Sequence, residues 1–244
     1  FNNTELSLTY NRVAQGLVHS KDDILYIPYD NKIAKNDNGV WTNVALTLPS
    51  HFYITSICEM GNNIAIAMSP TTGAVVGQSR AFIWDRAPSL TTLSETIPWD
   101  EGQLQILEVI DGFLVGISLT GNTTTRHNNR IIFRFLDGNN ILGYRAKKIM
   151  ELVVPSGQES SPPSSSTGSV ALPVAKQLLE GRLYFLAQAY INGEQRDGVW
   201  SFGKVGDRWA LNHERTPNND TALTSAVLHN FIYVGDFLFI IYDD

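Results

Sequence analysis

The sequence has few of the features that assign a protein to a familiar class. Its 244 residues include one cysteine, Cys58, so no disulfide can form within the chain. Cys58 stands in an apolar stretch, where we expect a small buried residue rather than a reactive thiol. No apolar run approaches the ~18 residues that a membrane-spanning helix needs, and membrane insertion is not expected.

Positive charge is also scarce. The chain has 18 Lys and Arg against 24 Asp and Glu, which gives a net charge of −6. Nucleic acids and anionic lipid surfaces attract basic proteins, so neither is expected as a partner.

The short motifs of common enzyme families are absent as well. The sequence contains no H-E-x-x-H, no G-x-S-x-G, no phosphate-binding loop and no C-x-x-C. Its five histidines are scattered, without the i, i+4 pair that a helical zinc site uses. The residues therefore indicate no metal, no cofactor and no catalytic group.

What the sequence does contain is a recurring hairpin pattern. Residues 103–118 form two runs of branched apolar residues around Asp111-Gly112, and Asp-Gly is a strong signal for a tight hairpin turn. The turns of successive repeats lie 40 to 55 residues apart once a 14-residue Ser/Pro/Gly tract is set aside. That period is typical of the blades of a β-propeller. The related stretches are 13–29, 53–68, 172–188 and 226–242.

The repeats predict an all-β chain, folded over residues 1–244 as one β-propeller domain with four-stranded antiparallel blades. About five blades are expected, and the last is a half blade that another segment completes, for which residues 4–8 are a candidate. The chain stops in the middle of a repeat, so we interpret it as a fragment of a longer protein. The approximate blades are 9–51, 52–101, 102–155, 170–221 and the half blade 222–244, with 156–169 as a flexible insertion.

Two stretches leave the type of secondary structure open. Residues 145–152 and 172–180 have a helical composition, although the repeat places strands at both positions. No long stretch shows the 3.6-residue period of an amphipathic helix, so a doubly wound α/β fold is not expected.

Loop lengths distinguish the two faces of the predicted propeller. Connections between the first and second and between the third and fourth strands are tight turns, whereas the other connections are long. Binding residues concentrate on loops held by a rigid scaffold, so the long-loop face is the candidate site. Its candidate ligand-binding residues are Trp99, Asp100, Glu101, Arg126, His127, Asn128, Arg196, Asn218 and Asp220.

These candidates have structural alternatives. Trp99 beside two carboxylates suits a platform for stacking a sugar, but a Trp packed between two blades explains it equally well. The turn-forming residues around Asn218 commonly bond to their own backbone. Glu59 and Glu108 occupy the same place in two repeats, three residues before the turn. They suit the acid and the nucleophile or base of a glycosidase. Both lie near the tight-turn end of the strand, however, away from the long-loop face, and this favours the polar lining of a central channel.

Three stretches resemble known proteins: residues 79–86 (SRAFIWDR), 97–118 (IPWDEGQLQILEVIDGFLVGIS) and 213–242. They resemble propeller-like segments of large, uncharacterised proteins from tailed phages and environmental metagenomes. The resemblance implies a structural protein of the virion or of the cell surface. It implies no activity, and no catalytic residue can be transferred from it.

These observations favour a non-enzymatic module that recognises a partner through its long-loop face. The expected partners are other virion or surface proteins and host glycans, and an oligomer is compatible with this interpretation. The expected location is the virion or the cell exterior. Two alternatives stay open, namely a carbohydrate-active propeller enzyme of glycosidase type and a bacterial extracellular scaffold for protein partners.

Overall fold

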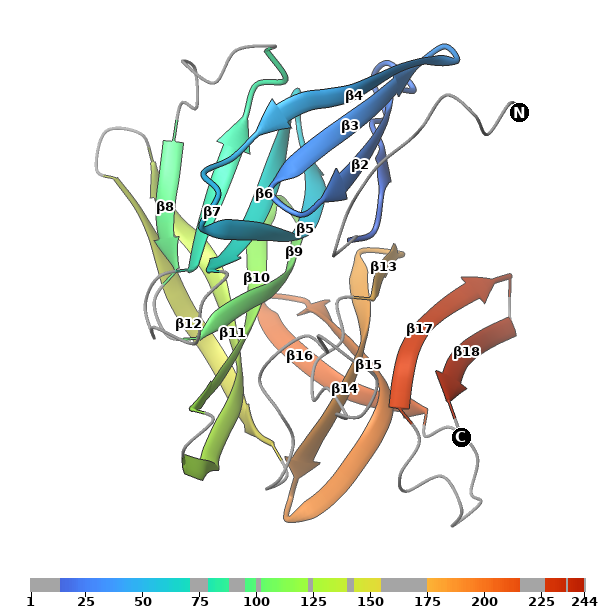
Figure 1. The fold of residues 1–244 in the computed structure, drawn as a ribbon. Coiled ribbons are helices and arrows are strands. Elements are labelled where there is room, and N and C mark those ends of the chain that lie inside the picture. Colours follow the sequence, from blue (N-terminus) through green and yellow to red (C-terminus); the bar gives the residue numbers. More distant parts are fainter. Residues whose placement is uncertain are drawn as a thin grey trace.

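The computed structural model describes residues 14–70, 79–87, 95–99, 102–122, 125–139, 143–154, 175–215, 227–235 and 237–243. Every regular element within these residues is a β-strand, and all strand pairs are antiparallel (Figure 1). The predicted all-β class is therefore confirmed. The predicted insertion 156–169 and the candidate closing segment 4–8 lie outside the described residues.

The first two sheets each contain four strands that pair in chain order. The first sheet consists of β1 (Leu17–Val18), β2 (Leu25–Tyr29), β3 (Lys32–Asp37) and β4 (Val40–Thr47). The second sheet consists of β5 (Phe52–Met60), β6 (Asn63–Pro70), β7 (Ser79–Trp84) and β8 (Glu95–Trp99).

The next two sets of four strands are linked into one larger sheet. A single residue pair, Val153 with Tyr190, joins β12 to β14 and connects the two sets, which we call the third and fourth sheets. The third sheet consists of β9 (Gln103–Ile110), β10 (Phe113–Asn122), β11 (Thr125–Asn139) and β12 (Gly143–Val153). The fourth consists of β13 (Lys176–Leu179), β14 (Arg182–Ile191), β15 (Glu194–Val205) and β16 (Arg208–Arg215).

The chain continues into a two-stranded unit, the terminal hairpin, made of β17 (Val227–Val234) and β18 (Phe237–Asp243). The two stretches of helical composition are extended: residues 145–152 lie within β12, and β13 occupies part of 172–180. Pairing with neighbouring strands therefore outweighs the local helical preference at both places.

Tight turns with positive φ close several hairpins at the predicted positions. Asp111 and Gly112 have φ angles of 50° and 78°, and Glu180 and Gly181 have φ angles of 48° and 75°. Residues with a Cβ atom rarely adopt such angles, whereas Gly adopts them without steric cost. The Gly at the second position of each turn therefore explains why the hairpins begin and end there.

Two of the expected long loops are strands instead. β10 continues to Asn122 and β11 begins at Thr125, so residues 120–129 belong mostly to a long two-stranded ribbon. β14 and β15 meet at Asn192 and Gly193, whose φ angles are 53° and 82°. Polar side chains suggested loops, but ladder hydrogen bonds keep the chain extended beyond the core. The predicted contrast in loop length is therefore wrong at these two connections.

The hydrophobic cores lie between successive sheets. Each sheet thus needs a neighbour to cover its apolar face, as layered β-structures generally do. The core residues include Tyr26, Ile33, Ile66 and Trp84 between the first and second sheets, Ile97, Trp99, Leu104 and Leu114 between the second and third, Ile117, Phe133, Phe185 and Trp200 between the third and fourth, and Leu186, Val199 and Phe231 between the fourth sheet and the terminal hairpin.

Trp99, at the end of β8, shows how closely the second and third sheets approach. Its side chain is fully buried against Gly116 of β10. A Cβ atom at position 116 would lie 2.3 Å from Cζ2 of Trp99 and 2.8 Å from Cδ1 of Leu104. The indole ring can occupy this place only because residue 116 has no side chain.

We expect Gly116→Ala to destabilise the protein by about 1–3 kcal/mol, because the added methyl group displaces the indole ring. Gly203→Ala is a control in β15 with a milder contact, because the atoms nearest to the new Cβ would be Cγ of Arg182 at 3.1 Å and the carbonyl oxygen of Gly181 at 3.3 Å. Urea denaturation measures the free energy of unfolding of both variants. Equal losses would contradict the close packing of Trp99 on residue 116.

Candidate axial site

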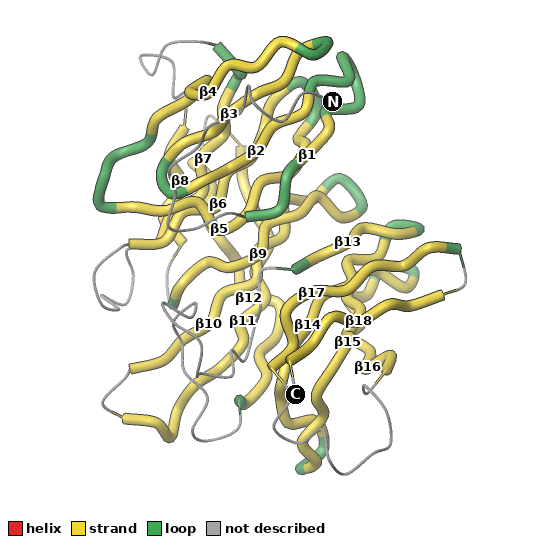
Figure 2. The backbone as a smooth tube through the Cα atoms, turned by 45° about the vertical axis from the view of Figure 1, so that its right-hand side comes forward, coloured by secondary structure: helices red, strands yellow, loops and turns green. Residues whose placement is uncertain are grey.

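The first strands of the second, third and fourth sheets, β5, β9 and β13, lie near the middle of the molecule (Figure 1, Figure 2). Buried hydroxyl groups link β5 to β9: Thr55 Oγ1 donates to the carbonyl oxygen of Leu104 at 2.6 Å. Ser56 Oγ donates to the carbonyl oxygen of Leu107 at 3.3 Å and accepts from its amide at 3.2 Å. These bonds run between sheets, so they fix how the second sheet sits against the third.

An amide side chain makes the corresponding link between β13 and β17. Gln177 Oε1 accepts a hydrogen bond from the amide of Tyr233 at 2.8 Å, and its Nε2 donates to the Tyr233 carbonyl oxygen at 3.3 Å. The side chain thereby satisfies the backbone of β17 as a neighbouring strand would. We call the region around the polar links of β5, β9, β13 and β17 the axial site.

Lys176, the first residue of β13, binds several strands at the axial site. Its ammonium donates hydrogen bonds to the carbonyl oxygens of Ile57 (2.9 Å) and Leu107, and to Oε2 of Glu108 (2.8 Å). All three N–H donors of the ammonium are therefore used. The backbone amide of Lys176 also donates to Oε1 of Gln15 at 3.3 Å. One lysine thus links β13 to β5, to β9 and to the segment that precedes β1.

The ion pair between Lys176 and Glu108 is nearly dry, with side-chain exposures of 7% and 13%. Removing a charge from water costs several kcal/mol, and the cost is offset only where good partners are supplied. Such a pair adds little net stability compared with an apolar pair, but losing one partner is strongly destabilising. The pair therefore favours one arrangement of β9 and β13 over the alternatives.

Glu59 stands on β5 at the position that corresponds to Glu108 on β9. Its carboxylate accepts hydrogen bonds from the amide of Ser20 at 2.8 Å and from the Ser20 hydroxyl. Partial burial acts to raise the pKa of Glu59, but the bonds from Ser20 prevail and hold it below its ordinary value. Both glutamates keep only a small exposed fraction. The axial site thus contains two carboxylates with different partners, which we call the axial carboxylate pair.

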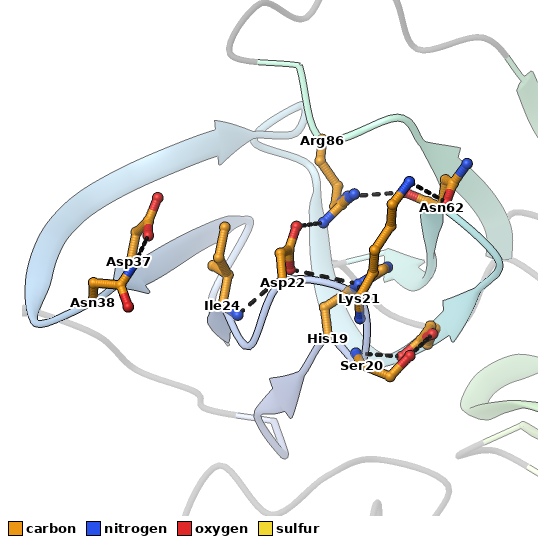
Figure 3. A network of polar contacts seen from close by, with 10 residues as sticks. His19, Ser20, Lys21, Asp22, Ile24, Asp37, Asn38, Asn62 and Arg86 are labelled. Atoms are coloured by element: carbon orange, nitrogen blue, oxygen red, sulfur yellow. Dashed lines mark hydrogen bonds and ion pairs between the residues drawn. The ribbon is translucent and has the colours of Figure 1, made fainter.

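A second polar network ties the first sheet to the second at the same end (Figure 3). The Arg86 guanidinium pairs with Asp22, and its Nε donates to the carbonyl oxygen of Asn62 at 2.8 Å. Lys21 Nζ donates to Oδ1 of Asn62 at 2.9 Å. Burial acts to raise the pKa of Asp22, but the bond from Arg86 prevails and lowers it. This network holds the Ser20 turn beside Glu59.

The other potentially reactive side chains are a buried cysteine and the possible metal ligands. Cys58 is buried, and burial raises the pKa of its thiol far above the ordinary value, so it stays protonated. Among the described residues, no three His, Cys, Asp or Glu side chains gather as a set of metal ligands. The same residues include no helix long and apolar enough to cross a membrane.

The structure places the residues predicted for the long-loop face differently from the prediction. The Trp99 ring has no exposed surface, so a sugar cannot stack on it, and the alternative of a Trp packed between sheets is correct. Arg196 is exposed on β15, and its guanidinium pairs with Glu194. These two residues belong to different sheets, Trp99 to the second and Arg196 to the fourth.

The remaining predicted residues fall into two groups. One group belongs to the strand β11 and not to a loop tip, which corrects the prediction for Arg126, His127 and Asn128. The other group lies outside the described residues, namely Asp100, Glu101, Asn218 and Asp220.

The axial site contains residues that the sequence did not single out. Lys176 is one lysine in an otherwise apolar stretch, and Ser20 is one residue of a polar turn, so neither belongs to a recognisable motif. The signal that does point here is the repeat itself, because it aligns Glu59, Glu108 and Gln177 at one level. Lys176 directly precedes Gln177, one of these equivalent positions, and it is a charged residue in an apolar stretch. These two features together identify it.

No family model and no curated protein matches the chain. Among solved structures, one match is the crystal structure of a thermostable family-43 glycoside hydrolase. The sequences are 13% identical and the TM-score is 0.48, and the match covers 94% of this chain and 82% of the hydrolase. At this level the likeness assigns no residue and no substrate to this chain.

These findings correct the expectation of a non-enzymatic virion or surface module. The matched protein is an enzyme, and nothing among the findings links the chain to phage proteins. The stretches that carried the resemblance, such as residues 97–118, are mostly buried strands and hairpin turns. Such residues reflect the packing of the sheets and not the presence or absence of an active site.

We expect Lys176→Met to destabilise the protein by about 3–5 kcal/mol, because the nearly buried Glu108 is left without its counter-ion. The double variant Lys176→Met/Glu108→Leu should recover most of that loss, since neither charge remains. A double-mutant cycle tests this. Chemical denaturation gives the free energy of unfolding of the wild type, Lys176→Met, Glu108→Leu and the double variant. Strictly additive losses would show that the two side chains do not interact.

Proposed function

We propose that the sheets are blades of a five-bladed β-propeller whose last blade, begun by the terminal hairpin, is completed by another segment. The order of the four-stranded sheets along the chain and the cores between successive sheets support this. So do the contacts among the first strands, which in a propeller are the innermost ones.

We propose further that the protein is a carbohydrate-active enzyme that hydrolyses glycosidic bonds at the axial site. The observation that carries this proposal is the axial carboxylate pair, Glu59 and Glu108, at matching positions on adjacent first strands. Glycoside hydrolysis typically uses two carboxyl groups, one as the acid and the other as the nucleophile or base. Extracellular glycans are the substrates that we propose for such a site.

The different partners of the two carboxylates suggest their roles. The Lys176 ammonium holds the Glu108 carboxylate at 2.8 Å and fixes its position, as a nucleophile or base requires. The partners of Glu59 are neutral groups of Ser20, which a bound sugar can replace. In the free protein the bonds from Ser20 favour the ionised form of Glu59. Once a sugar has displaced Ser20, Glu59 is the group that takes up a proton and gives it to the leaving oxygen. Because the pKa of free Glu59 is low, hydrolysis should be fastest at acid pH.

The test is hydrolysis of a panel of aryl glycosides and polysaccharides by the wild type, Glu59→Gln and Glu108→Gln. Each substitution should lower the rate by at least about 100-fold, the contribution expected of a catalytic acid or base. The wild-type rate should also fall between about pH 4 and pH 7. Glu194→Gln on β15 is the matched control, because that carboxylate is exposed and far along the sheet from the first strands.

Far-UV circular dichroism and the midpoint of thermal unfolding establish that each variant is folded. The proposal fails if the wild type releases no sugar from any member of the panel. It also fails if the folded Glu59→Gln and Glu108→Gln variants retain the wild-type rate.

A further inference from the structure

The first strands β5, β9 and β17 share an irregularity at the same distance from their hairpin turns. In each of them one residue has no partner in the ladder with the second strand, which is the mark of a β-bulge. The extra residue is Thr55 in β5 and Gln105 in β9, and in β17 the bulge lies between Leu228 and Asn230. Bulges occur preferentially next to functional sites, where they redirect a side chain. The level of these bulges is therefore a candidate for a further site.

At this level three hydroxyl groups of the second sheet fix the backbone of Leu104 in β9. Its carbonyl oxygen accepts from Thr55 Oγ1 at 2.6 Å and from Ser69 Oγ at 3.0 Å, and its amide donates to Ser79 Oγ at 3.1 Å. All three hydroxyl-bearing residues are buried. The residues on either side of Leu104 therefore project from a backbone that is held in place before any ligand binds, as precise recognition requires.

Those residues are Gln103 and Gln105, which we call the glutamine pair. Nε2 of Gln105 donates to Oε1 of Gln103 at 3.2 Å, and the exposures of Gln103 and Gln105 are only 8% and 2%. Within the described part of the chain the two amides have no other partner, although each offers two donors and two acceptor positions. Nearly buried amides with unmade hydrogen bonds are costly, so a partner for them is expected.

The glutamine pair presents both a donor and an acceptor to a ligand. With one bond made between the amides, an oxygen stays free on one residue and an NH₂ group on the other, whichever way the two amides are turned. A hydroxyl group can both donate and accept, whereas a carboxylate can only accept and an ammonium can only donate. Both amides are also neutral, so they supply no counter-charge to an ion. This chemistry favours a neutral ligand with several hydroxyl groups.

We propose that the glutamine pair binds hydroxyl groups of a neutral oligosaccharide and is a substrate subsite of the axial site. Gln105 and Glu108 stand three residues apart on β9, which is about 10 Å along an extended strand. A ligand that reaches both is therefore longer than one sugar ring. The inference rests on the proposed function for the class of its ligand, but it depends on residues other than the two carboxylates.

The experiment measures binding by calorimetry with thio-linked tetrasaccharides of glucose, galactose, mannose and xylose, which resist hydrolysis. Gln103→Met and Gln105→Met replace the amides with apolar groups of similar length. Each should weaken binding of the tightest neutral ligand about 3- to 10-fold, as the loss of a neutral hydrogen bond does. Gln195→Met on β15 is the matched control, because the Gln195 amide is exposed and bonded to Asp197, and it should leave the affinity unchanged.

A thio-linked tetramer of galacturonic acid tests the selection for neutral ligands, and it should bind more weakly than the galactose tetramer. Far-UV circular dichroism and the midpoint of thermal unfolding establish that each variant is folded.

The inference is overturned if no neutral tetramer binds the wild type, or if folded Gln103→Met and Gln105→Met bind as tightly as the wild type. It is also overturned if the control weakens binding equally, or if the galacturonic acid tetramer binds more tightly than the galactose tetramer. Binding through the glutamine pair without hydrolysis of natural linkages would contradict the proposed activity alone. Hydrolysis that needs Glu59 and Glu108 but not the glutamine pair would contradict this inference alone.

Discussion

The buried ammonium of Lys176 is the interaction on which the arrangement of the sheets depends. It has partners on β5 and β9. Moving β9 separates the ammonium from its counter-ion in a nearly dry place, and moving β5 removes the acceptor of one of its N–H groups. That cost is several kcal/mol, comparable to the whole stability of many domains. The apolar cores between sheets supply the favourable free energy, but such cores tolerate many arrangements. The ion pair between Lys176 and Glu108 selects one of these arrangements of the sheets.

The same interaction connects the fold to the proposed chemistry. Glu59 and Glu108 occupy equivalent places in two repeats, yet one is bound by a neutral serine and the other by a lysine. Equivalent backbone positions therefore acquire different electrostatics from their neighbours, as acid and base in one site require.

Much of the fold was predictable from local signals, and most of the site was not. The hairpin at Asp111-Gly112 followed from turn chemistry, and the strands around it begin and end within a few residues of the prediction. The ribbon through Asn122 and Thr125 was mistaken for a loop, because strands that extend beyond a core carry polar residues. For Trp99, the alternative of a ring packed between two sheets was correct. The burial of its ring depends on the missing side chain of Gly116, which is distant in sequence. Lys176 acquires its role only through contacts with distant strands, which no spacing reveals.

The most direct test of this account is ¹⁵N NMR spectroscopy of the lysine side chains at neutral pH. An ammonium with three protein hydrogen bonds and little exposure exchanges its protons slowly with water. We predict one protected ammonium signal, absent in Lys176→Met, with cross-peaks to protons of Ile57 and Leu107. If every lysine ammonium exchanges as fast as an exposed one, Lys176 does not join β5, β9 and β13, and the central claim is wrong.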